Sequence, residues 1–148
     1  LPYFAPESTP FVEMPGVCAD FDLEKANPGE YFRALLESQA LTMKVHAEVK
    51  QPPVSLRLTG GASANDLLQQ IIADVFQAPV SLGEFPESAA LGAALRAVNA
   101  VEKTPFAVLT SRFCKVRKVI HPLTENFPVY DRALLNYQKL LRQSRDQT

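Results

Sequence analysis

Apolar and polar residues alternate along the chain with a period that changes several times, and each change marks a predicted element. From about Gly29 to Val49, apolar side chains recur every three or four residues opposite a row of charged ones, which predicts an amphipathic helix packed on a core. Pro52 and Pro53 stop this helix. The predicted inward side of the helix consists of Phe32, Leu35, Leu36, Ala40, Met43 and Ala47.

A strand, a glycine turn and a second helix are predicted next. The alternation of apolar and polar residues predicts a strand over residues 54–58, with one face less buried than the other. Gly60 and Gly61 follow it directly. Ser63 or Asn65 can cap the next helix, because either side chain can accept a hydrogen bond from an unpaired backbone N–H. The inward stripe of that helix is predicted to be Leu67, Leu68, Ile71, Ile72 and Val75.

The following segment repeats the order of strand and helix. A short strand is predicted over residues 79–83, and a further helix begins near Pro86. Two strands joined through a helix are normally parallel with a right-handed crossover, so we expect an α/β fold with helices on the faces of a sheet. The later helix contains the small-residue stretch "ESAALGAALRA". Gly92 in this helix lowers its stability by about 1 kcal/mol relative to alanine. A glycine at such a position is expected where another backbone or a ligand approaches the helix closely.

The pattern is weaker after Ala100. The stretch "PFAVLTSRFCKVRKVIHP", residues 105–122, is strand-like and basic. It allows two interpretations, a basic binding patch or a connector or edge strand with solvated charges, and the balanced overall charge favours the second. The chain closes with a helix predicted from Val129 to about Arg145, whose core-facing stripe is Tyr130, Ala133, Leu134, Tyr137, Leu140 and Leu141.

Composition limits the expected partners and location. The chain has 148 residues, of which 47% are hydrophobic, and this is enough for one core and one domain. The formal net charge of -1 provides no broad electrostatic footprint, so neither nucleic acid nor a membrane is an expected partner. No apolar run approaches the roughly 18 residues of a membrane helix, and the amino terminus lacks the regions of a signal peptide. We therefore expect a cytoplasmic protein.

Established catalytic motifs are absent from the sequence. There is no P-loop and no GxGxxG, HExxH or CxxC pattern. Cys18 and Cys114 lie far apart without neighbours at ligand spacing, which predicts neither a disulfide framework nor a zinc site. His46 and His121 are too isolated in the sequence to be predicted general bases. We therefore predict no catalytic residue and no metal ligand in this chain.

The glycine pair is the strongest candidate for binding chemistry. Glycine permits backbone angles closed to other residues and lets main-chain N–H groups approach a ligand closely. The helix that follows adds unpaired N–H donors and the positive end of its dipole, which together favour a phosphate. The alternative is a tight turn that carries no ligand, and the pattern alone does not choose between the two.

Two motifs in this region resemble a known family. "TGGASAN", followed by "ESAALGAALRA", resembles the C-terminal domain of the FGGY carbohydrate kinases, which belong to the actin-like ATPase superfamily with its ribonuclease H-like fold. The preceding helix, "YFRALLESQALTMKVHAE", is also similar, and the resemblance runs from about Pro2 to the last helix. "GGAS-x-N" before a helix that ends "ADVF-x-APV" is most similar to the xylulose kinases of the family. The resemblance implies a β-α-β-α core with a C-terminal helix.

The resemblance also implies which residues bind a nucleotide. In the family, both glycines and the next alanine hold the ATP phosphates through their backbone, so the resemblance implies this role for Gly60, Gly61 and Ala62. Asn65 would then face the adenine side. The family's small-residue helix lines the nucleotide pocket, and the positions that match it are Glu87, Ala90, Leu91 and Gly92.

Length separates this chain from the whole kinases of the family. It begins "LPYFAPESTPF" without an initiator Met, and family members are several times longer. We therefore expect residues 1–148 to be the C-terminal domain on the nucleotide-binding side, with the N-terminal sugar-binding and catalytic domain absent. In the whole enzyme this part would form a wall of the site for ATP with Mg²⁺, and the γ-phosphate would pass to D-xylulose held by the other domain. The chain alone is expected to be inactive.

A second function stays open at this stage. The chain could be a non-catalytic interaction module, or a catalytically inactive relative, that uses the same fold to bind a partner. Two departures from the family pattern are "PESTP" at residues 6–10, where many members have "GERTP", and Ser38, where glycine is usual. "LPYF" and "PFAVL" are predicted to be exposed apolar segments, so self-association is also expected.

Overall fold

The computed structural model describes residues 7–8, 11–12, 25, 27–47, 51 and 53–145. "LPYF" at residues 1–4, Cys18 and most of "PESTP" lie outside the described residues. The elements in chain order are β1 (Glu7–Ser8), β2 (Phe11–Val12), α1 (Pro28–His46), β3 (Leu56–Leu58), η1 (Gly61–Ala64), α2 (Asp66–Phe76), β4 (Val80–Gly83), α3 (Ser88–Glu102), α4 (Phe106–Phe113), β5 (Val116–Ile120), η2 (Thr124–Asn126) and α5 (Phe127–Arg145). The elements η1 and η2 are single 3₁₀ turns.

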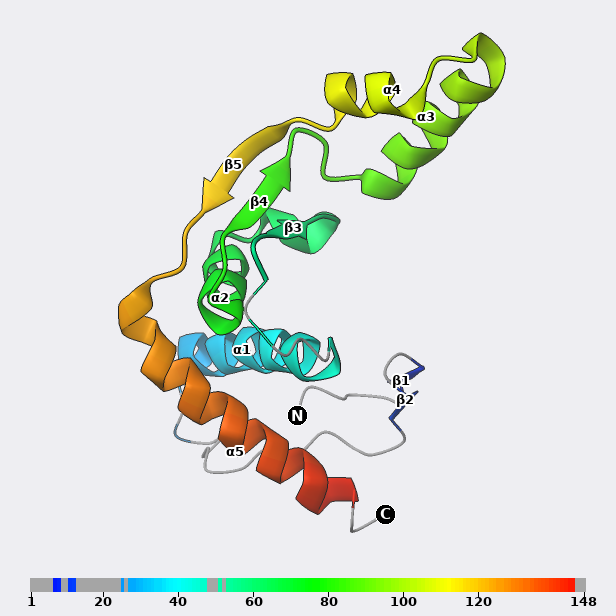
Figure 1. Ribbon diagram of the computed structural model, residues 1–148. Coiled ribbons are helices and arrows are strands. Elements are labelled where there is room, and N and C mark those ends of the chain that lie inside the picture. Colours follow the sequence, from blue (N-terminus) through cyan, green and yellow to red (C-terminus); the bar gives the residue numbers. More distant parts are fainter. Residues whose placement is uncertain are drawn as a thin grey trace.

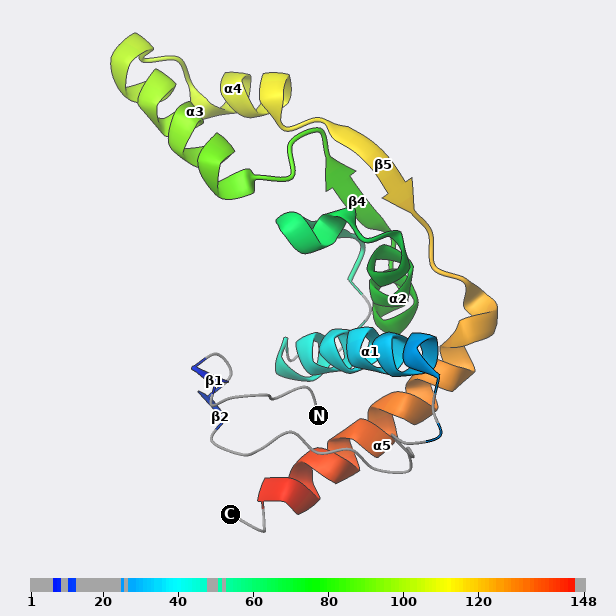
Figure 2. The same ribbon diagram turned by 180° about the vertical axis from the view of Figure 1, so that it is seen from behind.

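The described elements form a curved body with a projecting arm (Figure 1). Helices α1, α2 and α5 lie together at one end, the strands β3, β4 and β5 lie in the middle, and α3 and α4 project beyond the sheet. The view from behind shows the same separation of α3 and α4 from the other helices (Figure 2). Strands β1 and β2 form a small antiparallel pair of their own.

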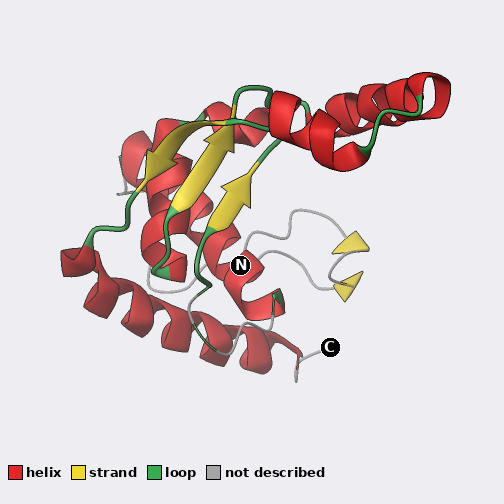
Figure 3. Cartoon of the chain, turned by 45° about the horizontal axis from the view of Figure 1, so that its top comes forward, coloured by secondary structure: helices red, strands yellow, loops and turns green. Residues whose placement is uncertain are grey.

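The main sheet has the strand order β3-β4-β5. Strands β3 and β4 are parallel, with Leu56 opposite Val80, and this confirms the strand–helix–strand unit predicted from the sequence. Strand β5 pairs antiparallel with β4 and lies at the edge of the sheet. For residues 116–120, the edge-strand interpretation is therefore confirmed. Figure 3 shows α1 and α2 on one side of the three strands.

The prediction of a strand-like segment was wrong for residues 106–113, which form helix α4. Phe106, Leu109 and Phe113 recur at helical spacing, and Leu109 is 4% exposed where α4 packs on α3. Pro105 stands at the N-cap, where its missing N–H removes no helical hydrogen bond. A short apolar run fits either period, and here the contact with α3 decides it.

The core lies between the sheet and the three helices α1, α2 and α5. Helix α2 contributes more of it than any other element, because the predicted stripe at Leu68, Ile71, Ile72 and Val75 is buried, whereas Leu67 is 38% exposed. The C-terminal helix begins at Phe127, slightly earlier than expected. Its buried residues include Tyr130, Tyr137 and Leu141, and the partly buried Ala133, Leu134 and Leu140 complete the predicted stripe.

The inward side of α1 differs from the predicted one. Its buried residues are Leu36, Ala40 and Leu41, whereas Phe32 is 52% exposed and Met43 is 48% exposed. Helix α1 packs on α2 and α5 rather than on the sheet, so its buried side is narrow and does not include Phe32 or Met43. Ala47, the last residue of the predicted side, is also exposed.

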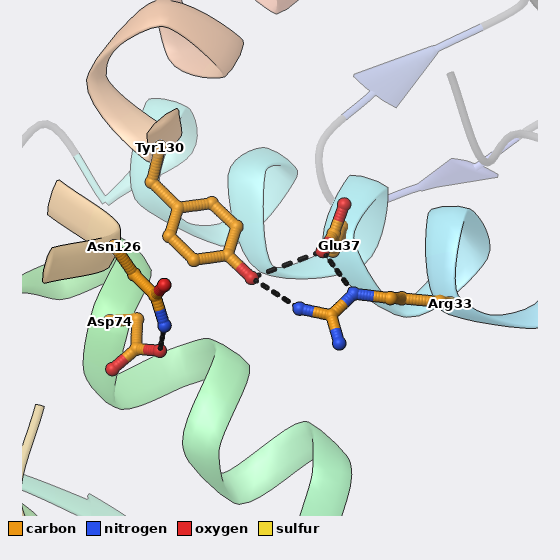
Figure 4. A network of polar contacts seen from close by, with 5 residues as sticks. All are labelled: Arg33, Glu37, Asp74, Asn126 and Tyr130. Atoms are coloured by element: carbon orange, nitrogen blue, oxygen red, sulfur yellow. Dashed lines mark hydrogen bonds and ion pairs between the residues drawn. The ribbon is translucent and has the colours of Figure 1, made fainter. Parts of the chain in front are cut away.

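Polar contacts join the helices of the body (Figure 4). Tyr130 of α5 donates its hydroxyl to Glu37 Oε1 of α1 at 3.0 Å, and Arg33 Nε donates to the same oxygen at 2.8 Å. Asp74 of α2 is 2% exposed and accepts from Asn126 Nδ2 at 2.8 Å and from the Leu123 amide at 2.7 Å. These bonds tie α1 and α2 to the C-terminal part of the chain.

Candidate functional site

The glycine turn between β3 and α2 has one residue that must be glycine for its backbone. Gly60 adopts φ +84°, a conformation that side chains rarely allow. Its N–H donates to the Pro86 carbonyl at 2.8 Å, and its carbonyl accepts from Ser63 N at 3.0 Å and from Ser63 Oγ at 2.6 Å. The polar groups of Gly60 are therefore already used inside the protein.

Side chains from α2 and β5 hold the turn in place through hydrogen bonds. Gln69 is 3% exposed and donates its Nε2 to the Ser63 carbonyl at 2.8 Å. Gln69 Oε1 in turn accepts from Lys118 Nζ at 3.0 Å, and Lys118 forms an ion pair with Asp66 at 2.9 Å. The hydrogen bond from Lys118 lowers the pKa of Asp66. Edge strand β5 thus helps to hold the start of α2 and the turn before it.

Two backbone amides of the turn have no hydrogen-bond partner among the described residues. Gly61 and Ala62 are exposed, and among the hydrogen bonds of the described residues none uses either N–H. A Cβ placed on Gly61 would meet no atom within 4 Å, and its φ is not positive, so packing within the described chain does not require glycine there. A group that approaches from outside would explain it.

Of the two predicted caps, Ser63 and Asn65, the residue that caps α2 is Asn65. Its side-chain Oδ1 accepts from the Leu68 amide at 3.0 Å. In the part of the chain that the structure describes, no hydrogen bond uses its Nδ2. Asn65 can therefore cap the helix and donate to a ligand at the same time.

A pocket of about 270 Å³ adjoins the turn, between the strand ends and the two helices α3 and α4. Its lining includes Thr59 before the turn, with Leu91, Leu95, Phe106 and Phe113. Of the helix α3 positions that the family resemblance placed beside the nucleotide, Leu91 and Gly92 line this pocket, and Glu87 and Ala90 do not.

The remaining candidates carry little further chemistry. His46 lies at the end of α1. His121 lies in the loop after β5, and its backbone carbonyl accepts from Gln70 Nε2 at 3.1 Å. Among the described residues, no three His, Cys, Asp or Glu side chains gather as a metal site would require. Within the same residues, no helix is both long and apolar enough to cross a membrane.

Sequence analysis missed the residues that support the turn. Pro86, in the loop before α3, accepts from Gly60, and Ser88 at the start of α3 donates to Thr59 just before the turn. Gln69 accepts from Lys118 and donates to the carbonyl of Ser63 in the turn. The usable signal was the parallel pair itself, because the carboxyl ends of parallel strands meet at one edge of a sheet. The position of Lys118 depends on the antiparallel register of β5, for which the sequence carries no local signal.

Known proteins resemble this chain in both sequence and structure. The model of the FGGY family of carbohydrate kinases, C-terminal domain, matches residues 1–101. Xylulose kinase 2 of Arabidopsis thaliana is 41% identical over 76 residues, which cover 49% of this chain and 14% of that protein. The xylulose kinase of Mus musculus is 40% identical over 79 residues, which cover 50% of this chain and 14% of that protein.

A solved structure extends the similarity beyond the matched residues. The crystal structure of xylulose kinase from Rhodospirillum rubrum has a TM-score of 0.74 and 28% sequence identity, covering 97% of this chain and 30% of that one. The chain therefore spans well under two thirds of the length of these relatives. The glycine turn and all of α3 but its last residue lie inside the family match, whereas α4, β5 and α5 lie beyond it.

Proposed function

The chain belongs to the FGGY family of carbohydrate kinases, and from this premise we propose that its glycine turn forms one wall of the ATP site of a sugar kinase. The amides of Gly61 and Ala62 bind nucleotide phosphate, and Asn65 Nδ2 donates to the base. Gly60 shapes the turn without contacting the ligand, because its N–H is donated to Pro86. Three of the four predicted nucleotide-binding residues are thus assigned direct contacts.

One observation carries this proposal. Within the described chain, neither the backbone angles of Gly61 nor its surroundings require glycine, and the amides of Gly61 and Ala62, at the start of the 3₁₀ turn η1, have no hydrogen-bond partner among the described residues. Successive backbone N–H groups without partners in the protein favour an anion. A methyl group at Gly61 would stand where a phosphate must approach.

The described residues fit a phosphate group better than a metal ion. They contain no group of three or more potential ligands, and Asp66 beside the turn is already paired with Lys118. We therefore assign no residue of the described chain to Mg²⁺. In the whole enzyme, the metal would come bound to the phosphates of ATP.

The proposed reaction of the whole enzyme is transfer of the ATP γ-phosphate to a hydroxyl of D-xylulose. Two relatives named xylulose kinase, in plant and mouse, support this choice of sugar. Phosphoryl transfer requires a nucleotide, a metal and an acceptor held in line, and the turn contributes to the first of these.

An amide NMR titration of the chain tests the proposal. ADP is expected to shift Gly61, Ala62 and Asn65 in a saturable way, whereas inorganic pyrophosphate shifts Gly61 and Ala62 but not the Asn65 side chain. Gly61→Ala is expected to weaken ADP binding at least about tenfold, since a steric cost of about 1.4 kcal/mol has that effect. The fold should persist, because the added Cβ meets no atom of the chain within 4 Å.

Gly29→Ala on α1 is the control: its added Cβ lies 3.2 Å from the cap atom Asn27 Oδ1, away from the assigned contacts, so it should leave ADP affinity unchanged. Equal ADP binding by Gly61→Ala and the parent chain would contradict the assigned contacts. No saturable shift at these residues with millimolar ADP would contradict nucleotide binding by this chain, and it would favour the non-catalytic interaction module instead.

A further inference from the structure

Helices α3 and α4 form an arm, here defined as residues 88–113, that stands apart from the helical body (Figures 1 and 2). The arm has a small core of its own, in which Leu95 is 6% exposed and Leu109 is 4% exposed. The Asn99 side chain closes its far end by donating to the Thr104 carbonyl at 2.8 Å. The chain enters and leaves the arm through the connections at residues 84–87 and 114–115.

A hydrogen bond joins the two connections to each other at the base of the arm, and another joins the connection at residues 84–87 to the glycine turn. The Glu84 amide donates to the Lys115 carbonyl at 3.2 Å, which holds the two connections together. Gly60 N donates to the Pro86 carbonyl at 2.8 Å, and Ser88 Oγ donates to Thr59 Oγ1 at 3.2 Å. We call Thr59, Gly60, Pro86 and Ser88 the latch.

The latch lies next to the amides of Gly61 and Ala62. Gly61 and Ala62 directly follow Gly60, whose φ of +84° is held in place by bonds on both its N–H and its carbonyl. A ligand on these amides therefore restrains the residue that holds Pro86. The first residue of α3, Ser88, is two positions beyond Pro86 and is not a cap, because the N-cap is Glu87.

We propose that the latch couples the two sites, so that an anion bound at Gly61 and Ala62 and the docked position of the arm stabilise one another. This proposal rests on the proposed function for its ligand, a nucleoside diphosphate. Thr59 and Ser88 are then positioning residues, which act through Gly60; because both also line the pocket beside the turn, their variants are compared with the parent chain at saturating ADP. Coupling of this kind is reciprocal, because each partner changes the free energy of the other by the same amount.

Hydrogen exchange of the whole chain, followed by NMR with and without ADP, measures the coupling. ADP is expected to slow exchange of the arm amides Leu95 and Leu109 by about fivefold, the lower end of typical coupling between sites. In the double variant Thr59→Val and Ser88→Ala, the effect should fall to about twofold, because the backbone bond from Gly60 remains. Neither substitution touches Gly61 or Ala62.

The coupling also has a test without any ligand. Leu95→Ala loosens the small core of the arm and is expected to speed exchange of the Ser63 and Asn65 amides in the turn by about threefold. The same change in the Thr59→Val and Ser88→Ala background should have a smaller effect on those amides, about 1.5-fold, because the backbone bond from Gly60 to Pro86 remains, and this difference separates transmission through the latch from general destabilisation.

The outcomes separate the two proposals. Absence of ADP shifts at Gly61 and Ala62 contradicts the proposed function, while the Leu95→Ala experiment still decides the coupling. ADP binding with unchanged exchange in the arm overturns the coupling and leaves the proposed function intact. An equal response of the turn to Leu95→Ala in both backgrounds also overturns it.

Discussion

Tyr130 combines a buried hydroxyl with a neighbouring carboxylate. Burial of the hydroxyl, together with the negative Glu37 beside it, raises the pKa of Tyr130 to about 12. The hydroxyl donates to Glu37 Oε1 at 3.0 Å and accepts from Arg33 Nη2 at 3.4 Å. The neutral phenol is therefore a fixed part of the contact between α1 and α5.

We predict that one tyrosine of this chain ionises only near pH 12. A folded-state pKa above the unfolded value means that the stability from this group is complete below pH 10 and is lost as the pH rises from about 10 to about 12. Absorbance of tyrosinate during alkaline titration measures it, and Tyr130→Phe should remove the late step. Ionisation of every tyrosine near pH 10, with the chain still folded, would contradict the burial of this hydroxyl.

The same substitution tests the hydrogen bonds. Tyr130→Phe is expected to cost about 1 kcal/mol of unfolding free energy, typical for the loss of one net hydrogen bond, in urea denaturation at pH 7. The effect should be modest because the ring still fills its place in the core.

At the scale of elements, Asp74 joins α2 to the segment that leads from β5 into α5. Its carboxylate accepts from the Leu123 amide, from Asn126 Nδ2 and from Gln70 Nε2 at 2.7, 2.8 and 2.9 Å. A carboxylate has no N–H to compete with these donors, so it suits a position where three donors converge. A second link runs from Lys44 of α1 to the Val75 carbonyl near the end of α2, and burial lowers the pKa of Lys44.

Asp74→Asn is expected to destabilise the chain by about 2 kcal/mol, because an amide places a donor against the Leu123 N–H or the Asn126 amide. Urea denaturation measures the loss, and hydrogen exchange should show it first in α5. Asp131→Asn is the matched control, since Asp131 is exposed and accepts only from Gln77 Nε2 among the described contacts. Equal effects of both substitutions would show that Asp74 does not anchor α5.

At the scale of the whole molecule, the described residues present the proposed nucleotide wall at the junction of body and arm. The turn, the pocket of about 270 Å³ and the base of the arm lie together there. Phe85 and Phe106 line this pocket and are 49% and 43% exposed. Apolar side chains of this size on a surface favour association with another surface.

We predict that this chain alone does not phosphorylate sugar. It spans 30% of the solved relative, and the proposed site supplies phosphate contacts without an assigned metal ligand or acceptor base. The measurement is ADP production with ATP, Mg²⁺ and D-xylulose, with the mouse xylulose kinase as a positive control. ADP production by the pure chain that depends on both Mg²⁺ and D-xylulose would contradict the prediction.

Much of the fold follows from local patterns in the sequence. The strand before Gly60, the cap at Asn65, the buried stripe of α2 and the C-terminal helix all appear where periodicity and capping place them. The family match over residues 1–101 agrees with the resemblance carried by "TGGASAN". The roles of Gly61, Ala62 and Asn65 in binding remain predictions.

The sequence by itself determined the order of strand, turn and helix around the glycines, because hydrophobic period, helix capping and glycine placement act between residues close in the chain. Tertiary structure alone decided that residues 106–113 are helical, that Phe32 and Met43 face outward, and that the N–H of Gly60 is donated to Pro86. These outcomes depend on contacts between residues far apart in the chain, whose geometry no local pattern records.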